Sequence, residues 1–146
     1  MKDQQTGNAG FTLVEILIVV VILGILAAII VPSFASVRDQ ASVGTTQSEL
    51  EKVRRAVEVY QVRNENTLPN VTAGDGTWGL LIAGNGEYLK GAPVNPYVGG
   101  ANQQTIVIAN SPDTTFQTDH AWVYDNTTGD VWAGGFDVND EPLPRP

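Results

Sequence analysis

The chain has 146 residues, no cysteine, a net charge of -8 at pH 7 and a pI near 4.4. This length suits one domain, and the lack of cysteine excludes disulfides and thiolate metal sites. An acidic chain is a poor nucleic-acid binder, because phosphate contacts need clustered lysine and arginine. The charge is also polarised. Residues 38–63 hold five of the eight basic residues (Arg38, Lys52, Arg54, Arg55, Arg63), whereas from position 111 onward seven acids accompany Arg145 (Asp113, Asp119, Asp125, Asp130, Asp137, Asp140, Glu141).

A long apolar run follows the first ten residues. It covers residues 11–31, and a helix of about 20 apolar residues crosses the hydrocarbon core of a bilayer. A cleaved secretory signal fits less well, because the run is too long, no small-x-small site follows it, and Asp3 offsets Lys2 in the leader. A buried core helix is the other alternative, but the remaining chain is too small to cover it. We therefore predict a membrane-inserted helix.

The run contains a carboxylate, Glu15, with no lysine, arginine or histidine within two helical turns in the run. An acid deep in a membrane helix costs roughly 2.5–3.5 kcal/mol and generally has a partner. Cleavage after Gly10 would create such a partner, an α-ammonium on Phe11 one turn away. A pair of this kind between subunits would favour one axial register, because slippage leaves both charges unpaired. The alternative is a carboxylate near the helix end that reaches the interface or becomes protonated.

The stretch "GFTLVEILIVVVILGILAAIIVPSF" resembles the N-terminal segment of type IV pilins and type II secretion pseudopilins. The resemblance implies that a prepilin peptidase and methyltransferase cuts between Gly10 and Phe11 and methylates Phe11. It also implies that Glu15 aligns an incoming subunit in a filament. The leader, residues 1–10, is less basic than family leaders usually are.

The same resemblance implies a location and partners. The precursor would be a single-pass inner-membrane protein with its C-terminal domain on the periplasmic or extracellular side. It would then assemble into a homo-oligomeric helical filament, in the periplasm or at the cell surface, with an inner-membrane assembly platform and minor pilins or pseudopilins. No nucleic-acid partner is expected.

Two residues predict local flexibility in the apolar helix, assigned to residues 11–34. Pro32 lacks an N–H and crowds the carbonyl of Ala28, so a bend or a short unravelled stretch is expected there. Gly24 lowers helix propensity eight residues earlier. We expect the helix to soften between these residues when subunits assemble.

Residues 35–64 continue the helix in amphipathic form. Leu50, Val53, Val57 and Tyr60 recur at helical spacing on one face, while charged residues fill the other faces. This half should lie against a globular sheet.

Residues 65–146 should form that globular region. "NENTLPNVTAGDG" ends the helix, "WGLLIAGNGEYLKG" contains a short helical turn, and "APVNPYVGG" forms an irregular connection. Residues 105–109 suit a strand, and residues 121–125 and 130–133 flank "NTTG" as a hairpin in which Gly129 supplies a positive φ. Strand alternation places Trp122 and Tyr124 on one face. The predicted fold is α+β: a long helix packed on a small antiparallel sheet, a pilin-like arrangement. The pattern from residue 87 to residue 133 also resembles pseudopilins, and the lack of cysteine favours them over disulfide-containing pilins.

The C-terminal "GGFDVNDEPLPRP" raises the question of calcium, which the resemblance to major pseudopilins brings with it. Asp137, Asn139, Asp140 and Glu141, with Asp125 or Asp130, would supply oxygen ligands. However, the stretch lacks the longer Gly- and Asp-rich loop of that family and does not match an EF-hand. An acidic solvated tail is the alternative.

Catalytic chemistry has little support in this sequence. His120 stands alone, and no serine motif with a paired base is present, so we assign no catalytic residue. Two glycosylation sequons, at Asn70 and Asn126, carry little weight.

The sequence therefore predicts a structural filament subunit rather than an enzyme. Three alternatives remain. One is a surface type IV pilus instead of a secretion pseudopilus. Another is a minor, priming, adhesion or DNA-uptake pilin whose sheet domain binds a ligand, and the third is a membrane-tethered enzyme.

Overall fold

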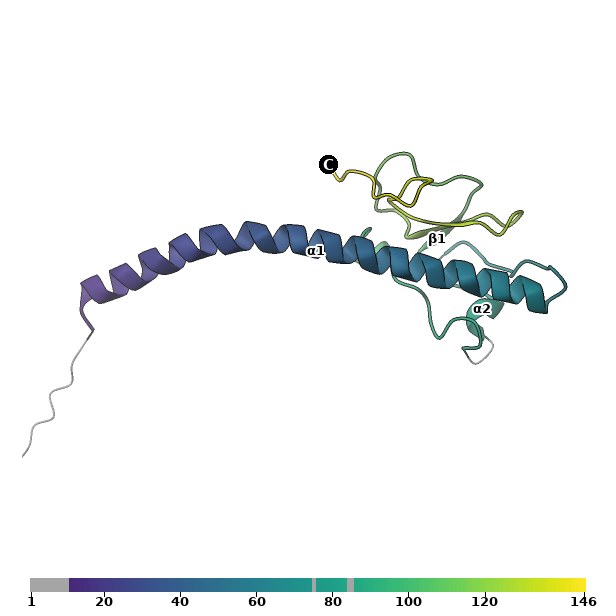
Figure 1. The fold of residues 1–146 in the computed structure, drawn as a ribbon, viewed down its shortest axis with the longest axis horizontal. Coiled ribbons are helices and arrows are strands. Elements are labelled where there is room, and N and C mark those ends of the chain that lie inside the picture. The colour runs from purple at the N-terminus through teal and green to yellow at the C-terminus, as the bar shows by residue number, and fades with distance from the viewer. Residues whose placement is uncertain (1–10, 75, 84–85) are drawn as a thin grey trace, which may run out of the picture. The chain divides into compact units, whose positions relative to one another are not determined.

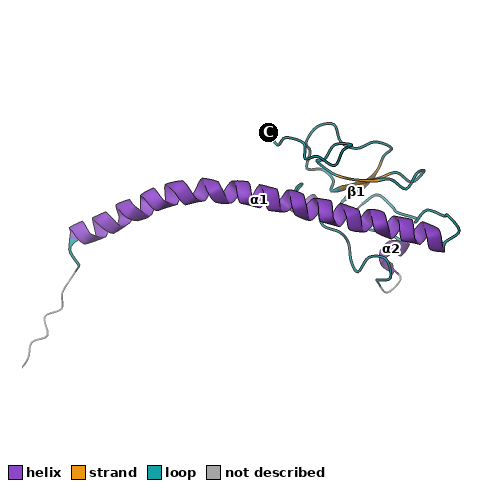
Figure 2. Ribbon diagram, in the orientation of Figure 1, coloured by secondary structure: helices purple, strands orange, loops and turns teal. Residues whose placement is uncertain are grey.

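The computed structural model describes residues 11–74, 76–83 and 86–146, and the leader predicted at residues 1–10 lies outside this part (Figure 1). The chain divides into two compact units, one that ends at Arg38 and one that comprises Asp39–Pro146. Figure 2 shows that helix dominates the first unit, whereas strands and loops surround helix in the second. The predicted α+β, pilin-like fold is confirmed.

Helix α1 spans Leu13–Arg63. It stays α-helical at Gly24 and Pro32, so the unravelled stretch expected there does not form in the single chain. The helix ends where the sequence predicts: Asn64 Nδ2 donates to Tyr60 O at 2.8 Å. The next two residues, Glu65 and Asn66, adopt positive φ angles of 52° and 63° and turn the chain away.

The sheet has three short strands, β1 (Ile106–Ile108), β2 (Trp122–Tyr124) and β3 (Val131–Ala133), in that order. Strands β2 and β3 form the predicted antiparallel hairpin, and Gly129 in its loop has the expected positive φ, 86°. Strand β1, however, pairs parallel to β2. The sheet is therefore mixed, and the prediction of a wholly antiparallel sheet was wrong in this respect.

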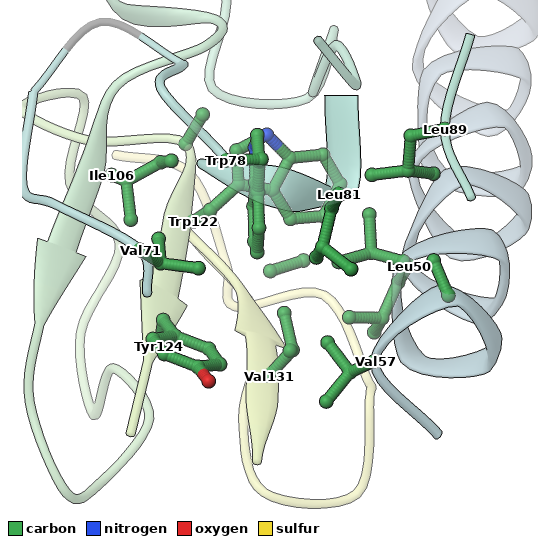
Figure 3. Close-up of a cluster of buried hydrophobic side chains, with 14 of the residues drawn as sticks. Leu50, Val57, Val71, Trp78, Leu81, Leu89, Ile106, Trp122, Tyr124 and Val131 are labelled. Carbon is green, nitrogen blue, oxygen red and sulfur yellow. The ribbon is translucent and has the colours of Figure 1, made fainter. Parts of the chain in front are cut away.

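The core joins the second half of α1 to one face of the sheet. The four residues predicted to share a helix face are all buried (Leu50, Val53, Val57, Tyr60). They meet the apolar face of β2 and β3 together with Trp78 and Leu81, the latter from the short helix α2 (Leu80–Ala83). Figure 3 shows this arrangement, with Leu50 and Val57 on α1 directed toward Leu81 and Val131. Burial of this face gives α1 its amphipathic pattern.

The connection between α2 and β1 is fixed by one polar side chain, Asn95, which is fully buried. Its Nδ2 donates to Ala121 O and Gly134 O, both at 2.9 Å. Its Oδ1 accepts from the backbone N–H groups of Tyr97 and Val98 at 3.0 and 3.2 Å. A buried amide is stable only when its groups are satisfied in this way, so Asn95 holds the loop against the sheet.

Candidate functional site at the start of the long helix

The first half of α1 presents apolar side chains on all sides. Every residue from Leu13 to Ile30 is exposed in the single chain, and this 18-residue segment is long and apolar enough to cross a membrane. Exposed apolar surface of this extent marks an interaction site for lipid or for other protein. Glu15 is the one ionisable residue in the segment.

Glu15 lies in a capping arrangement at the first turn of α1. Its Oε2 accepts from the backbone N–H and the hydroxyl of Thr12, both at 2.8 Å. In return, Thr12 Oγ1 accepts from the backbone N–H of Glu15 at 3.2 Å. This is a capping box, in which two side chains satisfy helix N–H groups reciprocally. We did not predict a role for Thr12 from the sequence, although its spacing to Glu15 carries the T-x-x-E signal.

The capping box fixes the carboxylate beside position 11. A carboxylate has two oxygens and about four acceptor sites, and only Oε2 is used by Thr12. The free acceptor capacity, close to the positive end of the helix dipole, can receive a further cation. Gly10, the other residue of the predicted cleavage site, lies outside the described residues, so the Phe11 ammonium remains a prediction.

Two of the predicted calcium ligands in the C-terminal loop, Asp140 and Asp137, are already engaged. Arg54 donates through Nη1 and Nη2 to the two carboxylate oxygens of Asp140, at 2.5 and 2.9 Å. Asp137 Oδ1 accepts from the backbone N–H groups of Asn139 and Glu141 at 2.8 and 3.0 Å. Hydrogen bonds from Glu141 and Asn139 lower the pKa of Asp137.

These residues do not form a ready-made calcium site. Within the part of the chain that the structure describes, no three His, Cys, Asp or Glu side chains gather closely enough to hold a metal ion. A guanidinium occupies both oxygens of Asp140, and calcium needs six to eight oxygen ligands. Asp125 is also committed, because its Oδ1 accepts from Thr127 and caps the hairpin loop. The geometry therefore does not favour calcium.

His120 has a structural role. Its Nε2 lies 3.1 Å from Asp113 Oδ1, while Asp113 Oδ2 accepts from Gln117 and from the backbone N–H of Gly135. Burial raises the pKa of Asp113, but the hydrogen bonds from these three residues outweigh it and hold the pKa below its ordinary value. No serine or threonine hydroxyl bonds to His120 in the described ranges, so the pair has no nucleophile to activate. It ties the loop before β2 to the turn after β3.

An N-terminal helix apolar enough to cross a membrane, an acid at its first turn and a small sheet packed on its second half are the features of the pilin-like class. The profile of the prokaryotic N-terminal methylation motif matches residues 6–31. Type II secretion system core protein G of Pseudomonas aeruginosa is 36% identical over 102 residues, which cover 64% of this chain and 71% of the relative. The core protein G of Aeromonas hydrophila is 30% identical over the same shares of the two chains.

The chain belongs to the family of type II secretion system core protein G, the major pseudopilins. It is also similar to a type IV pilin, the type IV wide pilus major component PilA4 of Thermus thermophilus, with 36% identity over 59% of this chain and 58% of that protein. No solved structure gives a significant match. The predicted resemblance to pilins and pseudopilins is confirmed.

Proposed function

We propose that this chain is a structural subunit of a secretion pseudopilus, assembled from the inner membrane after cleavage at Gly10–Phe11 and methylation of Phe11. The observation that carries the proposal is the capped Glu15 carboxylate at the head of an exposed apolar helix. In lipid this helix anchors the precursor, and in a filament the same surface packs against the helices of other subunits. Van der Waals packing and helix contacts then supply cohesion.

The ionic pair supplies register. An α-ammonium on Phe11 of one subunit and Glu15 of a neighbour would neutralise each other in an apolar core. A displaced subunit would leave two unpaired charges there, at a cost of several kcal/mol. The globular unit Asp39–Pro146 remains outside the membrane, on the periplasmic or extracellular side, and forms the filament surface.

The first experiment measures the intact mass and N-terminus of chains recovered from sheared filaments and from membranes. We expect a chain that begins at Phe11 and carries one methyl group. Glu15→Ala should insert and be cleaved normally but lose filament assembly. Thr12→Val is the matched control for the capping box, since it removes the Thr12 hydroxyl and leaves the Glu15 charge. Normal filament yield from Glu15→Ala, or a membrane chain that still begins at Met1, would refute the proposal.

A surface type IV pilus is the second candidate, favoured by the similarity to the wide pilus component of Thermus thermophilus. The two functions separate on deletion of the chain. Loss of exoprotein export identifies a pseudopilus, whereas loss of long surface fibres with intact export identifies a pilus. Minor, priming, adhesion or DNA-uptake subunits would be present in far fewer copies in purified filaments.

A further inference from the structure

A groove of about 710 Å³ lies between α1 and the segment 87–92 that follows α2. Part of its lining is apolar, contributed by Ala56, Val59 and Leu89. Val59 remains 38% exposed in the single chain. The volume falls within the range of about 300–1,000 Å³ in which proteins bind ligands. The groove can therefore accept an apolar side chain together with part of its loop.

The charged residues around this groove leave positive charge uncompensated. Lys52 pairs with Glu49 at 2.5 Å, and Glu87 pairs with Arg63 outside the groove. Arg55 and Lys90 also line the groove, and neither has an ion pair in the described ranges. In a chain of net charge -8, two free cations beside an apolar surface select a partner that is acidic and carries an exposed apolar group.

The loop 137–141, "DVNDE", has the complementary character. Val138 at its tip is 66% exposed, between Asp137 and Asn139. Glu141 is exposed as well, and neither Asp137 nor Glu141 forms an ion pair among the described residues. The loop thus presents one apolar side chain together with two acidic residues that have no ion pair in the described part of the chain.

The loop is also held in one conformation. Asp137 accepts from two backbone N–H groups of the loop, and Arg54 clamps Asp140 from α1. Gln47 Nε2 donates to Asp140 O at 3.0 Å and ties the loop to α1 a second time. A preorganised loop loses little conformational entropy when it binds.

The loop cannot reach the groove of its own chain. Gln47 and Arg54, which fasten the loop, lie on one flank of α1. Val59 and Arg55, which line the groove, lie on the other flank, since each residue is rotated by about 100° around the helix axis from the one before it. Figure 1 shows the same separation within the globular unit: the segment after α2 and the yellow C-terminal segment lie on opposite sides of α1. A loop that occupies the groove must come from another molecule.

We propose that the groove of one subunit binds the 137–141 loop of a second copy of this chain. Val138 enters the apolar part of the groove, and Asp137 and Glu141 approach Arg55 and Lys90. The two surfaces differ, so the contact is heterologous, and such contacts generate open helical polymers when they do not close into a ring. This inference rests on the proposed function, because it assigns a contact between subunits of the filament.

Cysteine pairs test the contact directly, since the chain contains no cysteine. Filaments of the double variant Val59→Cys, Val138→Cys should oxidise to a ladder of multimers, because each subunit links to two neighbours. Each single variant should give no species above a dimer. Ile108→Cys with Val138→Cys is the matched control. The exposed fraction of Ile108, 37%, is similar to that of Val59, but Ile108 lies on β1 and outside the groove. This control should give no ladder.

The same preparations separate this inference from the proposed function. Filaments of chains that begin at Phe11 but give no ladder from the Val59–Val138 pair would overturn the contact and leave the filament function standing. If the wild-type chain forms no filaments, the proposed function fails, and the contact fails with it. An equal ladder from the Ile108 control would also overturn the contact, because the linkage would then be nonspecific.

A charge exchange gives an independent test that needs no cysteine. Arg55→Glu should reduce filament yield severalfold, whereas Arg55→Lys should retain it. Adding Glu141→Arg to Arg55→Glu should restore yield, because the pair of charges is then reversed rather than removed. Unchanged yield from Arg55→Glu, or no recovery in the double variant, would overturn the assigned charge pairing.

Discussion

Asn95→Ala should destabilise the globular unit more than any surface substitution. The substitution removes five hydrogen bonds at once, four of them to backbone groups of the sheet edge and the loop and one to the Thr46 hydroxyl. Ala121 O keeps a second bond, from Gly134 N at 2.7 Å. The carbonyl of Gly134 and the N–H groups of Tyr97 and Val98 have no other hydrogen bond in the described residues.

The magnitude follows from these three groups. A buried polar group without a partner costs about 1–3 kcal/mol, and water that enters the vacated space recovers part of this cost. We therefore expect the free energy of unfolding to fall by about 3–4 kcal/mol. For a unit that spans Asp39–Pro146, each kcal/mol corresponds to about 4 °C. The Tm should drop by roughly 12–16 °C.

Urea unfolding of the processed chain in a mild detergent measures this change. The three tryptophans all lie in the globular unit, so their fluorescence reports on its unfolding and not on the apolar helix (Trp78, Trp122, Trp132). Thr46→Val is the control, because it removes one of the five hydrogen bonds of Asn95 and leaves the other four in place. The Thr46 hydroxyl also donates to Ser42 O at 2.8 Å, and its removal should lower the free energy of unfolding by about 1 kcal/mol or less. A loss below about 1 kcal/mol for Asn95→Ala would refute the reasoning.

Asn95→Asp refines the test through pH. The carboxylate keeps the acceptor role but loses both donors to the carbonyls of Ala121 and Gly134. Burial raises the pKa of such a carboxyl group, so the penalty is largest above that raised pKa and shrinks as pH falls through it. The stability deficit of Asn95→Asp relative to wild type should therefore decrease on acidification, whereas that of Asn95→Ala should not.

Three further predictions use the same unfolding measurement. Arg54→Lys should lose about 1 kcal/mol, because lysine cannot reproduce the two-pronged contact with the half-buried Asp140; an unchanged midpoint contradicts this. The pKa of Asp113 is lower in the folded chain than in the unfolded chain. The ionised Asp113 therefore stabilises the fold fully above its unfolded pKa near 4, and this stabilisation is lost as the pH falls through the lower pKa of the folded chain. Asp113→Asn should thus flatten the acid limb of the stability profile, and an identical limb in both proteins counts against it. The Tm should be the same in calcium and in a chelator. A Tm that rises with calcium in the wild type but not in Asp137→Asn would instead support a calcium site in the C-terminal loop.

The parts of the fold that the sequence predicts are those that follow from local spacing. The buried face of α1 from Leu50 to Tyr60 follows from a 3.6-residue period, because a helix buries one stripe against its neighbour. The hairpin follows from alternation around a loop that contains Gly129, where a positive φ is needed. Each of these signals lies within about 20 residues of chain, so no knowledge of distant partners is required.

The features that the sequence does not predict depend on distant residues. The parallel pairing of β1 with β2 joins Ile106 to Trp122, and nothing in a three-residue strand specifies the direction of its partner. Asn95 reads as a turn residue in a Pro- and Gly-rich loop, and its burial arises only when the loop meets α1 and the sheet. The pair between Arg54 and Asp140 spans 86 residues of sequence, so the acidic tail appeared solvated when considered alone.

The Arg54–Asp140 pair and the groove explain how the uneven charge distribution can serve assembly. Subunits of net charge -8 repel one another, but salt limits this repulsion to about 8 Å at physiological ionic strength. Electrostatic attraction between subunits in a filament therefore has to act over short distances. Arg55 and Lys90, beside the apolar part of the groove, supply it when the acidic loop 137–141 of a neighbour approaches. Val138 adds an apolar contribution that salt does not screen. Filaments should accordingly tolerate raised salt better than Val138→Asp filaments do, because that variant relies on ionic contacts alone. Equal salt sensitivity of the two would show that Val138 does not enter an apolar contact.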